Sequence, residues 1–347
     1  MAAHVLRHAA DLAQKVALSI VAPDGSQDWT YAQLESAVRG CATGLLNLGL
    51  TAGDRVILRL GNTADFPITY LACIAVDLIP VPLSAQLTAL EVAKISANIQ
   101  PALTIQSDDM PVASGSTFPA VGLHALYTNL PASYIMSDPN RPAYIIHTSG
   151  TSGQARGVIH AHRAVWARQM MWGGWYGLQP SDRLLHAGAF NWTYTLGTGL
   201  MDPWAIGATA LIPADGTDAS TLPALLAQYR ATIFAAAPGV YRRLLRPEMP
   251  ALPHLRHGLS AGEKLPEDTA TLWRRSTGTD IHEAFGMSEC STFISGSPAN
   301  PAPAGASGFP QSGRNVAIIQ SSLPVTAGQI GTIAIHRSDQ GLMLGYR

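Results

Sequence analysis

Short apolar runs alternate with amphipathic stretches along most of the chain. Runs of strand-like length are followed by longer stretches in which apolar residues recur every three or four positions. In the first half, the predicted strands are residues 16–21, 54–60, 79–83, 102–105 and 143–147. The predicted helices between them are residues 32–48, 65–76 and 87–99, the first with Thr30 as its N-cap. Strands that alternate with helices of this length favour βαβ units and a mostly parallel sheet.

The second half continues the alternation and then changes character. Helices are expected at residues 162–176, 195–206, 221–229 and 240–245, and strands at residues 183–187, 208–212 and 232–237. Residues 107–119 and 128–142, rich in Ser, Pro, Asp and Asn, are interpreted as surface connections. Beyond residue 300 the chain becomes rich in Pro, Ser and Gly, and two strands are expected at residues 316–319 and 331–336.

The pattern as a whole predicts an α/β fold. We expect two mostly parallel sheets with interleaved helices, in a layered αβαβα order, and a smaller β-rich subdomain. The approximate limits of the three subdomains are residues 1–142, 143–299 and 300–347.

Composition argues against some classes of partner but does not define the function. Charged residues make up 13% of the 347 residues, below the roughly 25% typical of soluble domains, and the net charge is −1. No basic stripe stands out, so neither nucleic acid nor an anionic membrane surface is an expected partner. The longest apolar run, residues 70–83, is broken by Asp77 and is too short to span a bilayer. Three cysteines without metal-site spacing, Cys41, Cys73 and Cys290, favour free thiols in a reducing cytoplasm.

Residues 148–157, Thr-Ser-Gly-Thr-Ser-Gly-Gln-Ala-Arg-Gly, form the most distinctive stretch and directly follow the predicted strand 143–147. Glycines let the backbone approach a ligand closely, and the hydroxyl groups and Arg156 suit anionic oxygens. A Walker loop is excluded because it needs a lysine, and no lysine lies between Lys94 and Lys264. We interpret the stretch as a polyphosphate-binding loop, with a Gly/Ser-rich surface turn as the alternative.

This loop resembles the phosphate-binding signature of the adenylate-forming superfamily, which includes acyl-CoA synthetases, firefly luciferase and the adenylation domains of peptide synthetases. The usual form of the signature is T-S-G-T-[TS]-G-x-P-K-G. Here Ala155 replaces the proline and Arg156 replaces the lysine. Arginine keeps the positive charge but presents a planar fork instead of a point ammonium, so phosphate neutralisation is expected to survive.

Two further segments resemble motifs of the same superfamily, in the same order. Residues 259–266 match the S-[AG]-G-[EA]-x-L segment that passes the adenine, although an ordinary strand-to-helix turn would look similar. Residues 281–289 match the Y-G-x-T-E motif, with Phe285 for the tyrosine and Ser288 for the threonine. The alternative for Ser288 and Glu289 is a helix N-cap that satisfies backbone donors.

A fourth segment points to the acyl group. Residues 188–197 are aromatic and poor in charge, and they resemble the F-x-Y-G-L-G segment of benzoate-type aryl-CoA ligases. Tyr194 falls on the motif tyrosine, and Thr195 replaces the first glycine. In those enzymes, the residues three and four positions beyond the glutamate also touch the acid, which here are Thr292 and Phe293. The alternative is that these aromatic residues belong to the core.

The resemblance implies three groups of site residues. The expected catalytic residues are Arg156 for phosphate neutralisation, Ser288 for the α-phosphate and Glu289 for Mg²⁺. The expected nucleotide-binding residues are Thr148, Ser149, Gly150, Thr151, Ser152, Gly153, Gly262, Glu263, Lys264, Glu283, Ala284 and Phe285, the last stacking on adenine. The expected acyl pocket consists of Phe190, Trp192, Tyr194, Ala261, Gly286, Met287, Thr292 and Phe293.

Residues 307–346 resemble the run that closes the large domain of acyl- and aryl-CoA ligases. In the superfamily, a T-G-D motif, a hinge and a C-terminal domain with a catalytic lysine come next, and none of these precedes Arg347. Residues 1–347 are therefore expected to be the large N-terminal AMP-binding domain without the lysine-bearing domain. Adenylation by this chain alone is expected to be weak or absent.

The resemblance implies an ATP-dependent carboxylic acid–CoA ligase that forms an acyl-AMP intermediate, with ATP, Mg²⁺ and CoA as its cofactors. An aromatic or other small carboxylic acid is the expected substrate. Two alternatives stay open: an adenylation enzyme that loads a carrier-protein thiol, and a non-catalytic nucleotide-binding domain. A homodimer is also left open.

Overall fold

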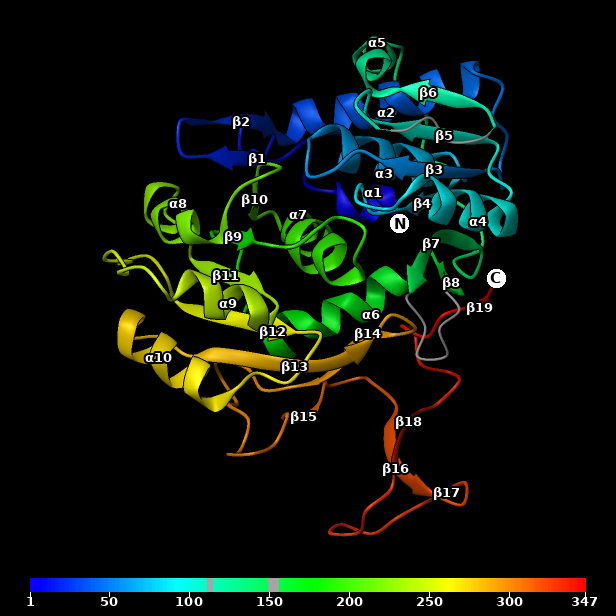
Figure 1. Cartoon of the computed structure of the whole chain (residues 1–347). Coiled ribbons are helices and arrows are strands. Elements are labelled where there is room, and N and C mark those ends of the chain that lie inside the picture. Colours follow the sequence, from blue (N-terminus) through cyan, green and yellow to red (C-terminus); the bar gives the residue numbers. More distant parts are fainter. Residues whose placement is uncertain (111–114, 149–155) are drawn as a thin grey trace.

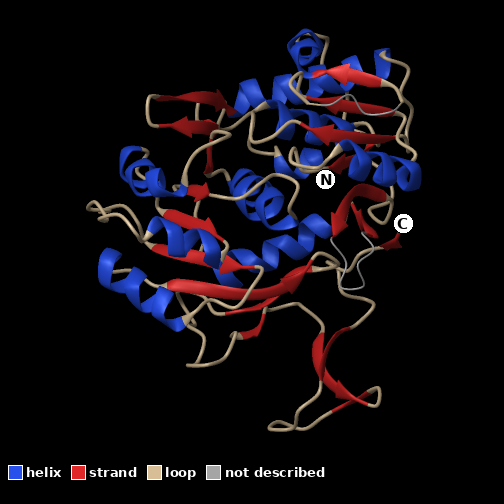
Figure 2. Cartoon of the chain, viewed as in Figure 1, coloured by secondary structure: helices blue, strands red, loops and turns tan. Residues whose placement is uncertain are grey.

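The computed structural model describes residues 1–110, 115–148 and 156–347. Two sheets form its framework, with helices between them and on their outer faces (Figures 1 and 2). The smaller sheet is entirely parallel, and its four strands lie in the order β4 (Ile79–Pro82), β3 (Arg55–Arg59), β5 (Leu103–Gln106) and β6 (Thr117–Pro119).

The larger sheet has nine strands and a parallel centre. Their order is β15 (Phe309–Pro310), β14 (Ser291–Ser295), β13 (Ile281–Met287), β12 (His257–Ala261), β11 (Ile233–Ala236), β9 (Arg183–His186), β10 (Thr209–Pro213), β1 (Val16–Ala22) and β2 (Gly25–Thr30). The six strands from β13 to β1 are parallel, whereas β2 and β14 pair antiparallel with their neighbours at the two sides. The prediction of two mostly parallel sheets is confirmed.

The largest apolar cluster lies between the two sheets. The helices that contribute to it are α1 (Ala2–Val5), α2 (Tyr31–Asn47), α3 (Asp65–Ala75), α6 (Ala164–Met171) and α7 (Asp202–Ile206). The short helix α5 (Leu123–Tyr127) adds Leu123 to the same cluster. Helix α2 begins where the sequence predicts, because Thr30 and Gln33 form a capping box that satisfies two otherwise unpaired backbone donors.

Helices also cover the outer face of each sheet, which completes the layered αβαβα order. On the larger sheet, Phe234 and Ala236 of β11 pack toward α8 (Leu222–Gln228), α9 (Pro238–Leu244) and α10 (Glu267–Thr277), whereas Ile233 and Ala235 join a cluster on the opposite face. On the smaller sheet, Ile57 packs against α4 (Ala89–Ile99). Strands buried on both faces are apolar at every position, which explains the continuous apolar runs in the sequence.

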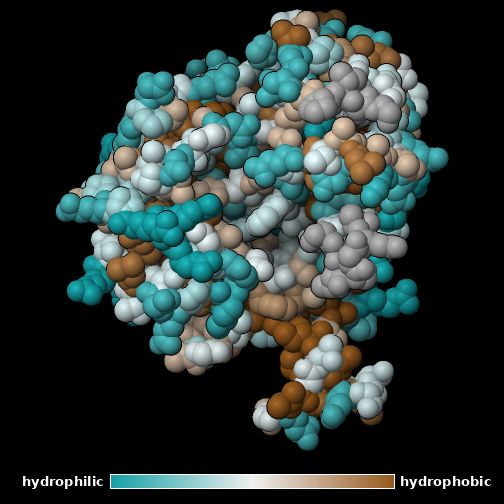
Figure 3. Space-filling view, viewed as in Figure 1, coloured by the Kyte–Doolittle hydropathy of each residue, from teal (hydrophilic) through white to brown (hydrophobic). Residues whose placement is uncertain are grey.

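Two small antiparallel sheets complete the described chain. One joins β7 (Pro142–Thr148), β8 (Arg156–Ala161) and β19 (Gly345–Tyr346). The other consists of β16 (Val316–Gln320), β17 (Leu323–Pro324) and β18 (Thr332–Ile335) and forms the arm at the lower right of Figure 1. This arm exposes apolar side chains, including Leu323 and Ile330, and Figure 3 shows apolar residues gathered over it.

Several local predictions differ from the structure. The stretch 107–119, predicted to be a connection, contains β6, and its residues 111–114 lie outside the described residues. The predicted helix 162–176 begins as α6 and continues as a π-helical segment, Trp172–Tyr176. The predicted helix 195–206 is a π-helical segment, Thr195–Met201, followed by α7. Such π-helical segments are often found at functional sites.

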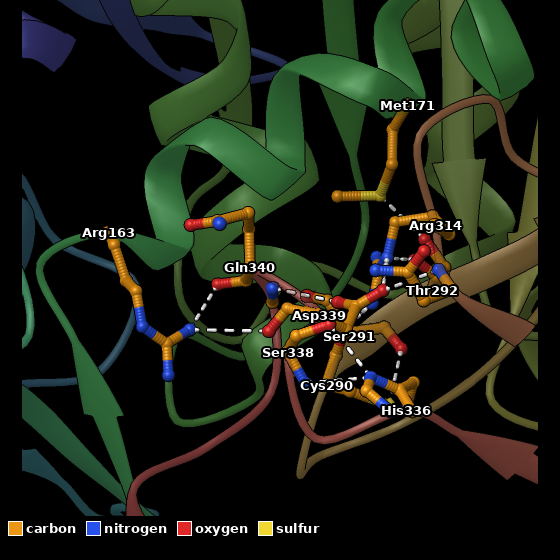
Figure 4. Close-up of polar contacts among 12 residues, drawn as sticks. Arg163, Met171, Cys290, Ser291, Thr292, Arg314, His336, Ser338, Asp339 and Gln340 are labelled. Atoms are coloured by element: carbon orange, nitrogen blue, oxygen red, sulfur yellow. Dashed lines mark hydrogen bonds and ion pairs between the residues drawn. The ribbon is translucent and has the colours of Figure 1, made fainter.

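A fully buried ion pair attaches the C-terminal region to the larger sheet (Figure 4). Arg314 Nε donates to Asp339 Oδ2 at 3.0 Å, and its two Nη groups donate to the carbonyl oxygens of Thr292 and Cys290 at 2.8 and 2.9 Å. Burial alone would raise the pKa of Asp339, but the hydrogen bonds and charge of Arg314 outweigh it and lower that pKa. The pair therefore connects the chain before the arm, the chain after it and strand β14.

Replacement of Asp339 by Asn is expected to lower the free energy of unfolding by about 3–5 kcal/mol, because Arg314 is left as a buried charge without its counter-ion. Urea unfolding monitored by tryptophan fluorescence would measure this loss. Asp280→Asn is the matched control, because Asp280 forms an exposed ion pair with Arg274 and its loss should cost at most about 1 kcal/mol. Equal effects of the two substitutions would contradict the assigned role of the buried pair.

Candidate active site

One large cavity, of about 1540 Å³, collects most of the predicted site residues that the structure describes. It lies at the carboxyl ends of β7, β12 and β13, where open α/β sheets bind their ligands. The predicted site residues that line it are Thr148, Arg156, Trp192, Tyr194, Ala261, Gly262, Gly286, Met287, Ser288 and Thr292. Segments more than a hundred residues apart in the sequence thus meet around one space.

The phosphate end of the cavity is described at its two edges. Thr148 ends β7 and Arg156 begins β8, its antiparallel partner, so the predicted phosphate loop joins two paired strands. The predictions for Ser149, Gly150, Thr151, Ser152 and Gly153 lie outside the described residues. The Arg156 guanidinium lies 5.3 Å from the centre of the Tyr346 ring, a cation–π contact that brings β19 to the same edge.

Ser288 and Glu289 occupy the turn between β13 and β14, so the helix N-cap alternative is wrong for them. Three contacts from remote segments hold this turn. His160 Nε2 donates to the Ser288 carbonyl at 2.7 Å, and the backbone N–H of Met343 donates to the Glu289 carbonyl at 2.7 Å. The Tyr346 hydroxyl donates to Glu289 Oε1 at 2.8 Å. The Glu289 carboxylate does not itself line the cavity, but it lies next to Ser288, which does.

The residues predicted to surround adenine divide into two sets. Gly262 lines the cavity, and Glu263 and Lys264 follow it on an exposed segment. Ala284 is buried in the core on the inner face of the larger sheet and does not line the cavity. Glu283 is half-buried with Lys264 Nζ at 3.9 Å, and burial raises the pKa of its carboxyl against the influence of Lys264.

Phe285 is close to the cavity without lining it. Its ring is 38% exposed and packs edge-on against Phe293, with ring centres 5.5 Å apart. The neighbouring residue Gly286 lines the cavity. Phe285 is therefore partly exposed next to a cavity-lining residue, and adenine stacking stays a prediction.

The residues predicted to form the acyl pocket do not all line the same cavity. Trp192, Tyr194, Ala261, Gly286, Met287 and Thr292 line the cavity. Phe190 instead lines a smaller cavity of about 330 Å³ and stacks on Phe66 with ring centres 5.0 Å apart. Trp192 and Tyr194 line both spaces.

The prediction that Phe293 touches the acid is wrong. Phe293 is fully buried, does not line either cavity and packs under the Arg314 guanidinium at 5.9 Å. Successive side chains of a strand point to opposite faces. Thr292 and Phe293 are neighbours on β14, so only Thr292 faces the cavity.

Sequence analysis missed a group of polar residues at the inner end of the cavity. Arg168, Thr198 and Ser291 all line it, and Arg168 is buried together with Asp202. Burial raises the pKa of the Asp202 carboxyl, while Arg168 acts in the opposite direction. The available signal was an arginine in the middle of a mostly apolar predicted helix, but a cation on a solvated helix face looks the same in sequence.

The described residues contain neither a metal-binding cluster nor a membrane-spanning helix. No cluster of three or more His, Cys, Asp or Glu side chains suited to a metal ion occurs among residues 1–110, 115–148 and 156–347. Within the same residues, every helix is too short or too polar to cross a membrane. All three cysteines are free and buried.

Comparison with known proteins identifies the family. A model of the AMP-binding enzyme family matches residues 5–347, almost the entire chain. The chain belongs to the AMP-binding enzyme family. This confirms the assignment made from the motifs at residues 148–157, 259–266 and 281–289.

Relatives of this family member include aryl-CoA ligases. It is 29% identical over 290 residues to a 3-hydroxybenzoate–CoA/4-hydroxybenzoate–CoA ligase of Thauera aromatica, covering 75% of this chain and 54% of the relative. It is 27% identical over 352 residues to a benzoate–CoA ligase of the same organism, covering 92% of this chain and 65% of the relative. The chain thus spans between about half and two thirds of these curated relatives.

Solved structures share the fold of this AMP-binding family member. The anthranilate CoA ligase AuaEII, solved in complex with anthranoyl-AMP, superposes with a TM-score of 0.90 at 24% sequence identity, covering 99% of this chain and 70% of that protein. A benzoate CoA ligase from Burkholderia xenovorans superposes with a TM-score of 0.87 at 23% identity, covering 99% of this chain and 72% of that protein.

The burial of His160 makes the stability of the family member pH-dependent. Burial, opposed by the hydrogen bond to Ser288, lowers the pKa of His160 to about 4, below its ordinary value of 6.5. The unfolded chain therefore binds more protons between these values, and stability is lost as the pH falls from 6.5 toward 4. His160 alone should account for about 2 kcal/mol of the loss between pH 7 and pH 5.

His160→Gln keeps an N–H donor for Ser288 but cannot titrate, so its unfolding free energy should fall less steeply between pH 7 and pH 5 than that of the wild type. Urea unfolding at both pH values measures the difference. The exposed His336→Gln is the matched control and should keep the wild-type pH dependence. If the unfolding free energy of the His160 variant depends on pH as steeply as that of the wild type, the His160 ring does not titrate as proposed.

Proposed function

We propose that the protein containing this chain is an ATP-dependent carboxylic acid–CoA ligase that forms an acyl-AMP intermediate. A single observation supports this function best: one cavity is lined by groups for phosphate, Thr148, Arg156 and Ser288, and by Trp192 and Tyr194 for an aryl group. An acyl-AMP needs both kinds of lining at once. The names of the curated relatives and of the structural neighbours agree with this proposal.

In the proposed reaction, a substrate carboxylate oxygen attacks the α-phosphorus of ATP, and pyrophosphate leaves. The thiolate of CoA then attacks the acyl carbonyl carbon, and AMP leaves. The residues described here form no covalent bond in either step. Their contribution is positioning and the stabilisation of phosphate charge.

The proposed roles follow the position of each residue in the cavity. Arg156 neutralises the β- and γ-phosphates together with the hydroxyl groups of Thr148 and of the adjoining loop. Ser288 donates to the α-phosphate. Glu289 holds Mg²⁺, which prefers hard oxygen ligands and commonly binds one or two carboxylates together with substrate phosphates. A single half-buried carboxylate fits this arrangement, since ATP would supply the remaining oxygens.

The proposed substrate is an aromatic or other small carboxylic acid. Trp192 and Tyr194 supply aromatic rings to the lining of the cavity. Tyr194 is held in place because its hydroxyl donates to the Leu259 carbonyl at 3.1 Å and its ring stacks on Trp175 at 5.7 Å. An apolar slot with a few polar groups suits a small carboxylic acid.

Titration calorimetry with benzoyl-sulfamoyl-adenosine, a stable mimic of an acyl-AMP, tests the site on this chain. Phe285→Ala should weaken binding by about fivefold or more, because stacking of an aromatic ring on a base contributes about 1–3 kcal/mol. Phe309→Ala is the matched control, since Phe309 is 41% exposed and lines neither cavity, and it should leave the affinity unchanged.

The octanoyl analogue separates the aryl preference from the site itself. If the octanoyl compound binds more weakly than the benzoyl compound, the proposal of an aryl acid substrate is supported. If only the octanoyl compound binds, that proposal is wrong. Absence of binding by both compounds would count against the proposed function.

A further inference from the structure

A buried ion pair forms part of the inner end of the cavity. Arg168, on α6, binds Asp202, at the start of α7, through two hydrogen bonds: Nε to Oδ1 at 3.0 Å and Nη2 to Oδ2 at 2.6 Å. Both side chains are at most 5% exposed. Of the two residues, only Arg168 lines the cavity. The pair therefore presents a guanidinium edge, already neutralised by Asp202, to whatever occupies the cavity.

The position of this guanidinium is fixed by its neighbours. A Cβ atom at Gly197 would lie 1.8 Å from Cζ of Arg168, so only a glycine at this position admits the side chain. Ser291 accepts a hydrogen bond from Arg168 Nη1 at 2.6 Å, and the Tyr176 hydroxyl accepts one from Nη2 at 3.3 Å. Arg168 thus bridges α6, α7 and strand β14, and it has little freedom to move aside for a ligand.

Counting donors and acceptors shows which groups remain available to a ligand. A guanidinium has five N–H groups, and the four hydrogen bonds above leave one, on Nη1, without an acceptor among the described residues. Ser291 accepts from Arg168, so its own hydroxyl hydrogen is free to donate. Both unused donors belong to cavity-lining residues.

One acceptor faces the same space. The Tyr176 hydroxyl donates to Asp202 Oδ2 at 2.8 Å, because an ionised carboxylate can only accept. Thr198 Oγ1, 2.7 Å from the Tyr176 oxygen, must then be the donor in that contact. Its lone pairs remain free, and Thr198 lines the cavity.

These groups discriminate between ring substituents. Two donors and one acceptor match a hydroxyl group, which can accept from Arg168 and Ser291 and donate to Thr198. An unsubstituted ring would cover these polar groups without bonding to them, which is costly in a buried site. A second carboxylate would bring a negative charge to an arginine that Asp202 already neutralises.

We propose that Arg168 and Ser291 make the site selective for an aromatic acid that carries a ring hydroxyl group. This inference rests on the proposed function, since it assigns the substrate of the same cavity. Arg168 and Ser291 would contact the substituent directly, and Gly197 would act only by leaving room for Arg168.

The test compares 3-hydroxybenzoyl-, 4-hydroxybenzoyl-, benzoyl- and 4-carboxybenzoyl-sulfamoyl-adenosine by titration calorimetry with this chain. At least one hydroxybenzoyl compound should bind more tightly than the benzoyl compound, by a factor of about ten or more. The 4-carboxybenzoyl compound should bind no better than the benzoyl compound. Binding of all four with similar affinity would overturn the inference but keep the proposed function, whereas no binding of any of them would count against both.

Two variants test whether these residues cause the preference for a hydroxybenzoyl compound: Ser291→Ala and the double variant Arg168→Met/Asp202→Asn. Each should reduce the ratio of hydroxybenzoyl to benzoyl affinity to about threefold or less. General damage to the site would weaken the binding of both compounds and leave the ratio of their affinities unchanged. An unchanged affinity ratio in Ser291→Ala therefore overturns the inference. This variant leaves the buried ion pair intact, so the test remains decisive if the double variant does not fold. Thr277→Ala, whose hydroxyl lies on α10 outside the cavity, is the matched control and should keep the wild-type ratio.

Discussion

The ion pair between Arg314 and Asp339 is the contact on which the active-site geometry most depends. Taking two charges out of water is expensive, and such a pair is stable only when additional hydrogen bonds satisfy it. Arg314 meets this condition by donating also to the carbonyls of Cys290 and Thr292. These carbonyls belong to the chain directly after Ser288 and Glu289. The pair thus fixes the hairpin that carries the third motif, and His160 and Met343 hold its turn from two other segments.

The sequence predicted those parts of the fold that depend on local signals. Helix α2 is one example, since both partners of its capping box, Thr30 and Gln33, lie within four residues. Helix α5 is a counterexample. It has five residues, too few to show a helical period, and it exists because Leu123 is buried in the large core cluster. The antiparallel pairing of β19 with β8 was also beyond sequence analysis, because Gly345 and its partner Ile159 are distant along the chain.

The same distinction applies to the candidate site. Motif order indicated which residues approach the cavity, and Thr148, Arg156, Tyr194 and Ser288 line it. Motif order did not indicate which way neighbouring side chains point, and Phe293 was misplaced for this reason. Arg168 was missed because its significance depends on Asp202, 34 residues later, and on the gap left by Gly197. A partner of this kind leaves no pattern in a single sequence.

The two ends of the cavity differ in how strictly they can select a ligand. At the phosphate end, Arg156 and Tyr346 are exposed, so water can replace a lost contact and salt screens their charges. At the inner end, Arg168 and Thr198 are almost fully buried, and water cannot easily replace a missing substituent there. An unsatisfied group is therefore penalised at the inner end and tolerated at the phosphate end. Since every substrate of the proposed reaction shares the phosphates and differs only in the acid, selection belongs at the buried end.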